Sequence, residues 1–183
     1  EASRSLVEAW VTEGKMIYGI RTGFGEFANV SIPIAGIKEL KQNLLRSHSA
    51  GVGVPLRDEV VRAMLLLRAN ALAKGYSGVR PVVIEQLLRF LKLDLIPVIP
   101  SRGSVGSSGD LAPLAHLALA LTGEGNISIP GDKGTREILD AGLALKKFKV
   151  SSLQLEAKEG LALINGTQMM SAIGSLALDK AKR

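Results

Sequence analysis

Residues 102–121 read "RGSVGSSGDLAPLAHLALAL", and this stretch joins two segments of opposite character. The first half is rich in glycine and serine, which at such density normally mark a solvated loop. The second half is apolar at almost every position, which is typical of a buried helix. A flexible segment set directly against a buried helix is either a tight internal turn or a segment whose backbone itself has a function.

The apolar half carries signals for both ends of a helix. Asp110 is expected to cap the helix, and Pro113 falls in the first turn, where an N–H group would lack a partner anyway. The helix is predicted to run to Leu121 or Thr122 and to stop at Gly123.

Upstream of this stretch the pattern is also helical. Apolar residues recur at helical spacing from Ile37 to Leu45, and the same spacing reaches His48. The His48 side chain is therefore expected on the face of the helix that packs on the core. Two more helices are predicted, one inside residues 55–78 that stops at Gly75 and one over residues 81–94, followed by an extended connector over residues 95–103.

Downstream, the composition changes twice. Residues 123–135 have the composition of a hairpin, a short helix is predicted around Arg136 to Leu145, and a long helix is predicted from about Leu153 to the end. Asn165 and Gly166 interrupt that last helical pattern, and such local violations tend to collect at functional sites.

Composition supports one helical unit over residues 1–183. Hydrophobic residues make up 46% of the 183 residues and aromatic residues only 4%. The excess of leucine, alanine, isoleucine and valine suits close packing of helices better than an aromatic-rich sheet sandwich. The fold class is therefore predicted to be mainly α, with short extended segments around the glycine-rich loop.

Several classes of protein are disfavoured. The chain has no cysteine and two histidines, His48 and His116, which excludes a thiolate metal site and argues against any metal; His116 is interpreted as a hydrogen-bonded core residue. The start of the chain does not resemble a signal peptide, and no apolar run approaches the ~20 residues of a membrane span, so a soluble cytoplasmic protein is expected.

The net charge of +6 comes mostly from scattered lysines and arginines. Nucleic-acid binders cluster such charge with stacking aromatic residues, so nucleic-acid binding is disfavoured and an anionic substrate is favoured. Residues 23–28 match the dinucleotide-binding pattern G-x-G-x-x-G/A. That pattern has to follow a strand and open a helix, and the sequence predicts neither here, which argues against dinucleotide binding.

Four segments occur in an order that identifies a family. They are "YGIRTGFGEFANV" (residues 18–30), "RSHSAGVG" (46–53), "GSVGSSGDLAPLAH" (103–116) and "EGLALINGTQ" (159–168). Together they closely resemble the signature segments of the aromatic amino acid ammonia-lyases, above all those that act on histidine. The resemblance extends over nearly the whole chain and implies the helical, aspartase/fumarase-like fold of these lyases.

The resemblance implies a prosthetic group made from the chain itself, with no external cofactor. By position, Ser107-Ser108-Gly109 would cyclise into a methylidene-imidazolone: the Gly109 nitrogen attacks the Ser107 carbonyl carbon, and two waters leave, one with the Ser108 hydroxyl. Glycine suits this compressed geometry because a side chain would obstruct it. The chain departs from the family at Ser107, where alanine is usual.

The resemblance also assigns the remaining site residues. Tyr18 matches the general base that removes the β-proton, His48 matches a substrate-binding histidine, and Asn165 matches an asparagine that contacts the prosthetic group or the substrate. The polar pair Ser47-His48 favours L-histidine, converted to trans-urocanate, over tyrosine.

Three alternatives stay open. A tyrosine ammonia-lyase and a tyrosine 2,3-aminomutase would share every motif, and a non-catalytic helical scaffold is a third reading. Because relatives of this family are longer, the chain is expected to be the amino-terminal portion of a lyase, and the full-length protein is expected to be a homotetramer.

Overall fold

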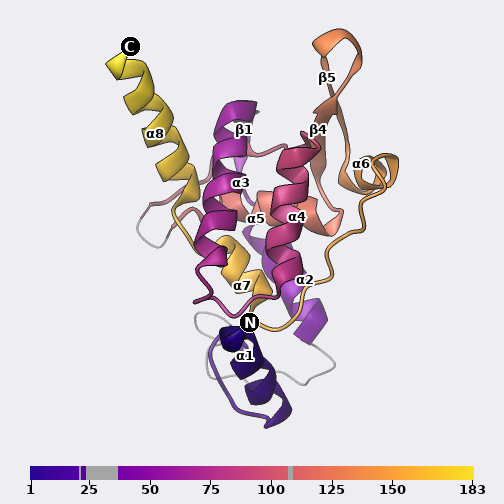
Figure 1. The fold of residues 1–183 in the computed structure, drawn as a ribbon, viewed down its shortest axis with the longest axis vertical. Helices are drawn as coiled ribbons and strands as arrows, with labels where there is room; N and C mark the ends of the chain where they lie inside the picture. The colour runs from indigo at the N-terminus through magenta and orange to yellow at the C-terminus, as the bar shows by residue number, and fades with distance from the viewer. Residues whose placement is uncertain (21, 24–36, 107–108) are drawn as a thin grey trace.

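Helices dominate the part of the chain that the computed structural model describes, residues 1–20, 22–23, 37–106 and 109–183 (Figure 1). The helices are α1 (Ala2–Thr12), α2 (Ile37–His48), α3 (Asp58–Ala73), α4 (Pro81–Lys92), α5 (Leu111–Thr122), α6 (Ala141–Lys147), α7 (Glu159–Ile164) and α8 (Gln168–Lys182). The short extended segments are β1 (Val52–Pro55), β2 (Ile96–Pro97), β3 (Pro100–Arg102), β4 (Asn126–Pro130) and β5 (Arg136–Asp140), with a 3-10 turn, η3, at Asp132–Gly134.

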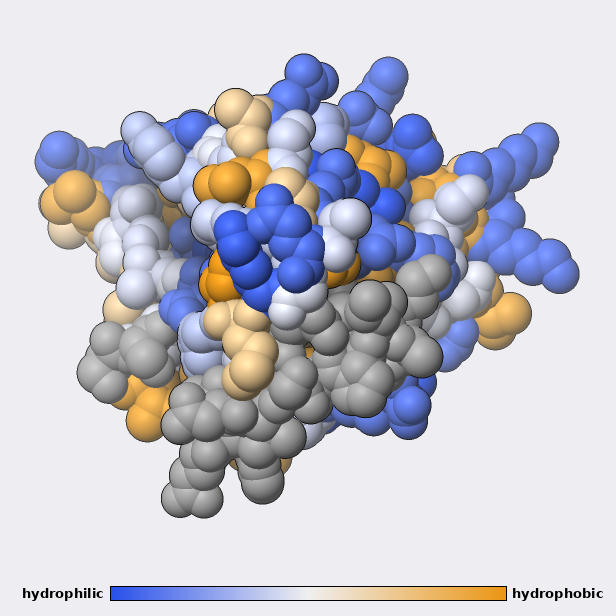
Figure 2. Space-filling view, turned by 90° about the horizontal axis from the view of Figure 1, so that it is seen from below, coloured by the Kyte–Doolittle hydropathy of each residue, from blue (hydrophilic) through white to orange (hydrophobic). Residues whose placement is uncertain are grey.

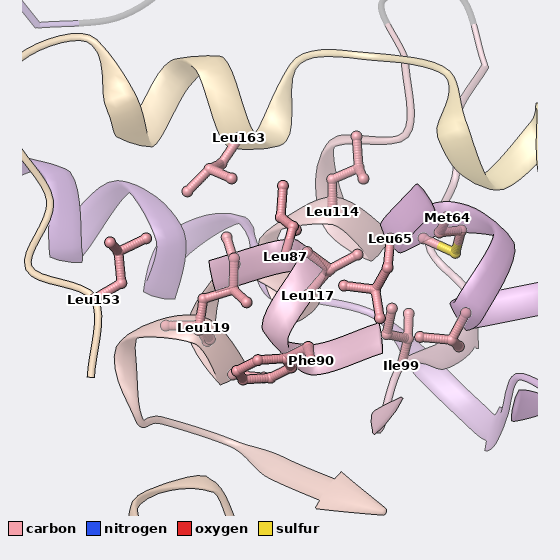
Figure 3. Packing of buried hydrophobic residues seen from close by; sticks show 14 of the residues in the cluster. Met64, Leu65, Leu87, Phe90, Ile99, Leu114, Leu117, Leu119, Leu153 and Leu163 are labelled. Atoms are coloured by element: carbon pink, nitrogen blue, oxygen red, sulfur yellow. The ribbon is translucent and has the colours of Figure 1, made fainter. Parts of the chain in front are cut away.

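Helix α5 lies in the centre of the core. It packs against α2 and α7, while α3 packs against α4 and α8. Leu114 and Leu117 of α5 are fully buried and meet Leu87 and Phe90 of α4 in the middle of the cluster (Figure 3). Each fully buried leucine contributes about 1.5–3 kcal/mol. The glycine-rich loop is therefore attached to a helix of the central core.

The predicted helix boundaries upstream of Gly123 are confirmed. Helix α3 begins at Asp58, α4 begins at Pro81, and α5 ends at Thr122 before Gly123. Gly123 has a φ of +91°, in the left-handed region that glycine adopts at helix ends. These boundaries were predictable because short-range signals, proline at the start and glycine at the stop, set them.

The prediction of a helix from Arg136 to Leu145 is wrong in its first half. Residues 136–140 form β5, which pairs antiparallel with β4, and the helix α6 begins only at Ala141. The Asp140 side chain accepts the Leu143 N–H at 3.2 Å, so this carboxylate caps α6 and marks its start. The hairpin predicted from the composition of residues 123–135 is confirmed in part: its first strand, β4, and its turn lie in that range, but its second strand is β5, residues 136–140.

The prediction of one long helix from Leu153 is also wrong. Residues 151–158 are not helical, and the helix is then divided into α7 and α8 by residues 165–167. Among the described residues, Glu159–Lys182 is long and apolar enough to span a membrane, contrary to the expectation from sequence, but a buried core helix passes the same test. Only part of this span is buried: Ala162, Leu163 and Ile164 of α7 lie in the core, whereas Met169 and Ala172 are the buried residues of α8.

Strands β1 and β3 bring two predicted site segments together. They pair antiparallel, with Val52 opposite Arg102 and Pro55 opposite Pro100. Strand β1 follows the end of α2, which carries His48, and β3 leads into the glycine-rich loop. This pairing therefore sets the His48 segment beside the start of that loop.

Helix α1 lies at one end of the molecule, on a second apolar cluster made of Val7, Ile20 and Ala157 (Figure 1). The buried Arg4 of α1 donates to the Ala157 carbonyl at 2.9 Å and joins this end to the rest. The face seen from below in Figure 2 mixes polar side chains with small apolar areas.

Candidate active site at the loop before α5

Gly109 lies where only glycine fits. Its φ is +106°, and its N–H donates to the Gly106 carbonyl at 2.8 Å. A Cβ built on Gly109 would lie 2.3 Å from the Gly166 oxygen and 2.8 Å from the Gly166 carbonyl carbon, which is closer than nonbonded atoms approach. Backbone conformation and backbone packing therefore both exclude a side chain here. Ser107 and Ser108, the other members of the expected triad, lie outside the described residues.

Asp110 joins the loop to the break between α7 and α8. Its N–H donates to the Gly166 carbonyl at 2.6 Å. Its fully buried carboxylate accepts the Ser104 hydroxyl at 2.6 Å and the Met170 N–H at 3.0 Å. Met170 is in the first turn of α8, so this carboxylate satisfies an N–H group that α8 itself leaves without a partner.

The predicted capping role of Asp110 is therefore corrected. Asp110 stands at the N-cap position of α5, but its side chain makes no capping bond to that helix. It caps α8, about 60 residues further along the chain, because the fold places the start of α8 beside the loop.

Arg68 of α3 contacts the break at residues 165–167 on the side opposite Gly109. Asn165 is extended, with its side chain exposed, and its carbonyl accepts from Arg68 Nη2 at 3.0 Å. A Cβ on Gly166 would lie 2.2 Å from Arg68 Nη1 and from Gln168 Oε1. Gly166 is thus enclosed between Arg68 on one side and Gly109 on the other.

Arg68 was not singled out from the sequence. Its side chain is only 4% exposed, and burial lowers its pKa to about 10. The available signal was an arginine inside the almost fully apolar body of α3, a position where charge is seldom found without a role.

His48 is held by the end of its own helix. Its Nδ1 lies 2.9 Å from the Leu44 carbonyl and 3.1 Å from Ser47 Oγ. A carbonyl only accepts, so Nδ1 donates here, and whenever the ring is neutral Nε2 is left as an acceptor. The ring can therefore receive a hydrogen bond from a substrate N–H or O–H group.

His116 is hydrogen-bonded, as predicted, but it is only half-buried and not fully in the core. It supports the segment after His48. Gly51 donates its N–H to His116 Nε2 at 3.2 Å, and burial lowers the pKa of His116, which favours the neutral ring that accepts this bond. A Cβ on Gly103 would lie 3.1 Å from the Gly51 Cα. The His48 segment, α5 and the start of the loop therefore meet at this point.

Tyr18 lies in the turn that follows α1, with its side chain 49% exposed. This turn rests on the cluster of Val7, Ile20 and Ala157, whereas the loop at Gly109 rests on the main core. Gly109, Asp110 and Gly166 are thus brought together directly, and the His48 segment joins them through Gly51 and Gly103. Tyr18 lies in a segment whose apolar residues Ile17 and Ile20 pack in the second cluster. Within the described ranges, no group of three or more histidine, aspartate or glutamate residues could hold a metal ion.

The chain is similar to known lyases along its whole length. A family model described as aromatic amino acid lyase matches residues 1–183. Histidine ammonia-lyase of Geobacillus thermodenitrificans is 54% identical over 181 residues, covering 99% of this chain and 35% of that protein. The chain spans about a third of the length of the curated relatives that it matches.

Solved structures agree with this fold. Histidine ammonia-lyase from Trypanosoma cruzi matches with a TM-score of 0.87 and 43% identity, covering 98% of this chain and 33% of that one. Tyrosine aminomutase from Streptomyces globisporus matches with a TM-score of 0.87 and 40% identity, covering 99% and 33%. The predicted mainly α lyase fold is confirmed, and the chain belongs to the aromatic amino acid lyase family.

Proposed function

We propose that residues 1–183 are the amino-terminal, loop-bearing unit of a longer lyase that removes ammonia from L-histidine and releases trans-urocanate. The observation that carries this proposal is the junction in which Gly109, at a positive φ, packs on the Gly166 backbone. The choice of histidine is supported by 54% identity to a histidine ammonia-lyase.

The residues present fit a methylidene-imidazolone made from Ser107-Ser108-Gly109, with no external cofactor. The fit rests on Gly109, because ring closure through its nitrogen needs a residue without a side chain and the structure has no room for one. Such a group supplies an electrophile that eases the departure of ammonia.

The roles of the side chains follow from the chemistry of the elimination. Tyr18 takes the β-proton, the electron pair of that C–H bond forms the new double bond, and the C–N pair leaves with ammonia. His48 orients the substrate ring through Nε2, and Asn165, exposed beside Gly109, contacts the substrate or the prosthetic group.

A tyrosine-specific lyase or aminomutase is the second candidate. The specific observation in its favour is the 40% identity to a tyrosine aminomutase, and the Nε2 acceptor of His48 would serve a phenol hydroxyl as well as an imidazole. A non-catalytic scaffold is the third candidate.

The protein is further proposed to act in the cytoplasm on small amino acids, as a homotetramer, without nucleic acid or membrane partners. Its charge of +6 would favour the carboxylate group of such a substrate through the field of the whole protein.

An absorbance assay on the full-length protein tests the function. We expect an increase in urocanate absorbance with L-histidine, no product with tyrosine, and an intact mass lower than calculated by two waters. Product from tyrosine alone would move the assignment to the second candidate, and full mass with no product would favour the scaffold.

Two pairs of variants test the roles. Ser108→Ala is expected to abolish turnover and to prevent the loss of the second water, because the hydroxyl that leaves with it is absent. The exposed Ser152→Ala serves as its control. Tyr18→Phe is expected to keep the mass loss but lose most of the rate, whereas Tyr76→Phe, 90% exposed, is expected to change neither. A wild-type rate in Tyr18→Phe would remove Tyr18 from the role of base.

A further inference from the structure

We propose that Arg68 is a positioning residue for the candidate active site: its guanidinium holds the end of α7 and the Gly166 peptide on which Gly109 packs. The inference rests on the proposed function and adds to it a residue that makes no contact with substrate.

The first step is the set of bonds that Arg68 makes. Nη2 donates to the carbonyls of Ala162 and Asn165, and Nη1 donates to Gln168 Oε1 at 2.8 Å. One planar group thus joins the last turn of α7, the break and the first residue of α8. The flat fork of a guanidinium can serve these three acceptors in fixed directions, which the single ammonium of lysine cannot.

The second step connects Arg68 to the loop. Gly166 lies against Nη1, its carbonyl accepts the Asp110 N–H at 2.6 Å, and its backbone leaves no room for a Cβ on Gly109. Displacement of the guanidinium would therefore move the Gly166 peptide, and with it Gly109 and Asp110.

The third step is the cost of this arrangement. No carboxylate of the described residues lies within salt-bridge distance of Arg68, and its Nε has no hydrogen-bond partner there. The negative end of the α7 dipole offsets only part of the cost of a buried charge. A costly group retained beside the candidate site is expected where geometry matters more than stability.

Arg4 provides the matched comparison. It is also buried, at 9% exposed, and it also donates to a backbone carbonyl, that of Ala157. It lies on α1, away from the junction of Gly109 and Gly166. A lysine at either position keeps the charge and removes the fork.

The experiment compares Arg68→Lys and Arg4→Lys in the full-length protein. Three quantities are measured: the fraction of chains lighter by two waters, kcat and KM for L-histidine, and the melting temperature. We expect Arg68→Lys to lower kcat on the order of 100-fold, with a smaller change in KM and a lower cyclised fraction. Arg4→Lys is expected to lower the melting temperature alone.

Two results would overturn the proposal: wild-type kcat and cyclised fraction in Arg68→Lys, or equal losses in Arg4→Lys. If Arg68→Lys does not fold, Gln168→Leu removes one acceptor and leaves the charge. It is expected to lower kcat in the same direction by a smaller factor, and an unchanged kcat would refute the proposal. If the wild-type protein neither turns over histidine nor lacks two waters, the proposed function fails, and this inference with it.

Discussion

A charged side chain is buried at each end of α7, and the two side chains differ in how far their hydrogen-bond partners compensate the charge. At the first residue, Glu159 is fully buried and accepts from Arg80 Nε at 2.8 Å, from Arg80 Nη2 at 2.7 Å and from the backbone N–H groups of Arg80 and Glu156. At the last turn, Arg68 reaches carbonyls and an amide but no described carboxylate. One charge is fully compensated and the other is not.

The pKa values express the same difference. Burial alone would raise the pKa of Glu159, but its hydrogen bonds with Arg80 and Glu156 outweigh burial and lower it below the ordinary value. Burial lowers the pKa of Arg68, with no bond to a carboxylate to oppose it. The start of α7 is therefore organised for stability, whereas its end holds backbone at the junction beside the loop.

The largest effect is expected from Gly109→Ala, which breaks the junction at the end of α7. The alanine methyl group would collide with the Gly166 carbonyl, and the alanine backbone would have to keep the positive φ of Gly109. We therefore expect no cyclisation and no turnover, measured by intact mass and by urocanate formation. Gly75→Ala is the control, since Gly75 has a φ of +81° but open space around it, and it is expected to cost only about 1–2 kcal/mol. A cyclised, active Gly109→Ala protein would contradict the assignment of this junction.

Glu159→Gln breaks the other end. Removal of a buried charge from its partner is expected to lower the free energy of unfolding by about 3 kcal/mol, measured by urea denaturation, while the folded protein keeps its mass loss. The exposed Glu85→Gln on the neighbouring α4 is expected to change stability by less than about 0.5 kcal/mol. Loss of cyclisation in folded Glu159→Gln would mean that the two ends of α7 are not separate in function.

The pH dependence of stability sharpens the same contrast. A carboxyl whose pKa is lowered on folding stabilises the protein above its ordinary pKa, near 4.5, and this contribution disappears as pH falls through the lower folded value. The stability difference between wild type and Glu159→Gln is therefore expected to narrow between about pH 5 and pH 3. A difference that stays constant over this range would show that Glu159 is not the titrating group.

The smallest effect is expected at a helix end outside α7. Asp140→Ala removes the side-chain cap of α6 and is expected to cost about 1 kcal/mol in urea denaturation, with no change in activity. Asp132→Ala, at an exposed site with no capping bond, is the control. If Asp140→Ala lowered the free energy of unfolding as much as Glu159→Gln does, the distinction between an exposed helix cap and a buried ion pair would not hold.

Local patterns predicted much of the fold and misjudged two segments. Residues 136–140 form a strand because β4 supplies backbone partners, and a helical pattern in one short segment does not reveal a partner strand. Residues 151–158 are not helical although they follow an apolar pattern. Leu153 donates its N–H to the Leu121 carbonyl at the end of α5 instead.

The candidate site was predictable in part. Gly109 stood out through the resemblance of its loop to a family signature, and Asn165 and Gly166 stood out because they interrupt a helical pattern in the sequence itself. Arg68 did not stand out, because its role depends on carbonyls that lie about 100 residues away along the chain.

The amino-acid sequence by itself determined the starts of α3 and α4 and the end of α5, because proline, glycine and apolar spacing act over a few residues, and its signature segments determined the family. The tertiary structure alone decided that Asp110 caps α8 instead of α5, that Gly109 rests on Gly166, and that a buried arginine supports both. The physical reason is that a hydrogen-bond donor or acceptor in the core takes whichever partner the packing brings near, and packing joins residues that no local pattern connects.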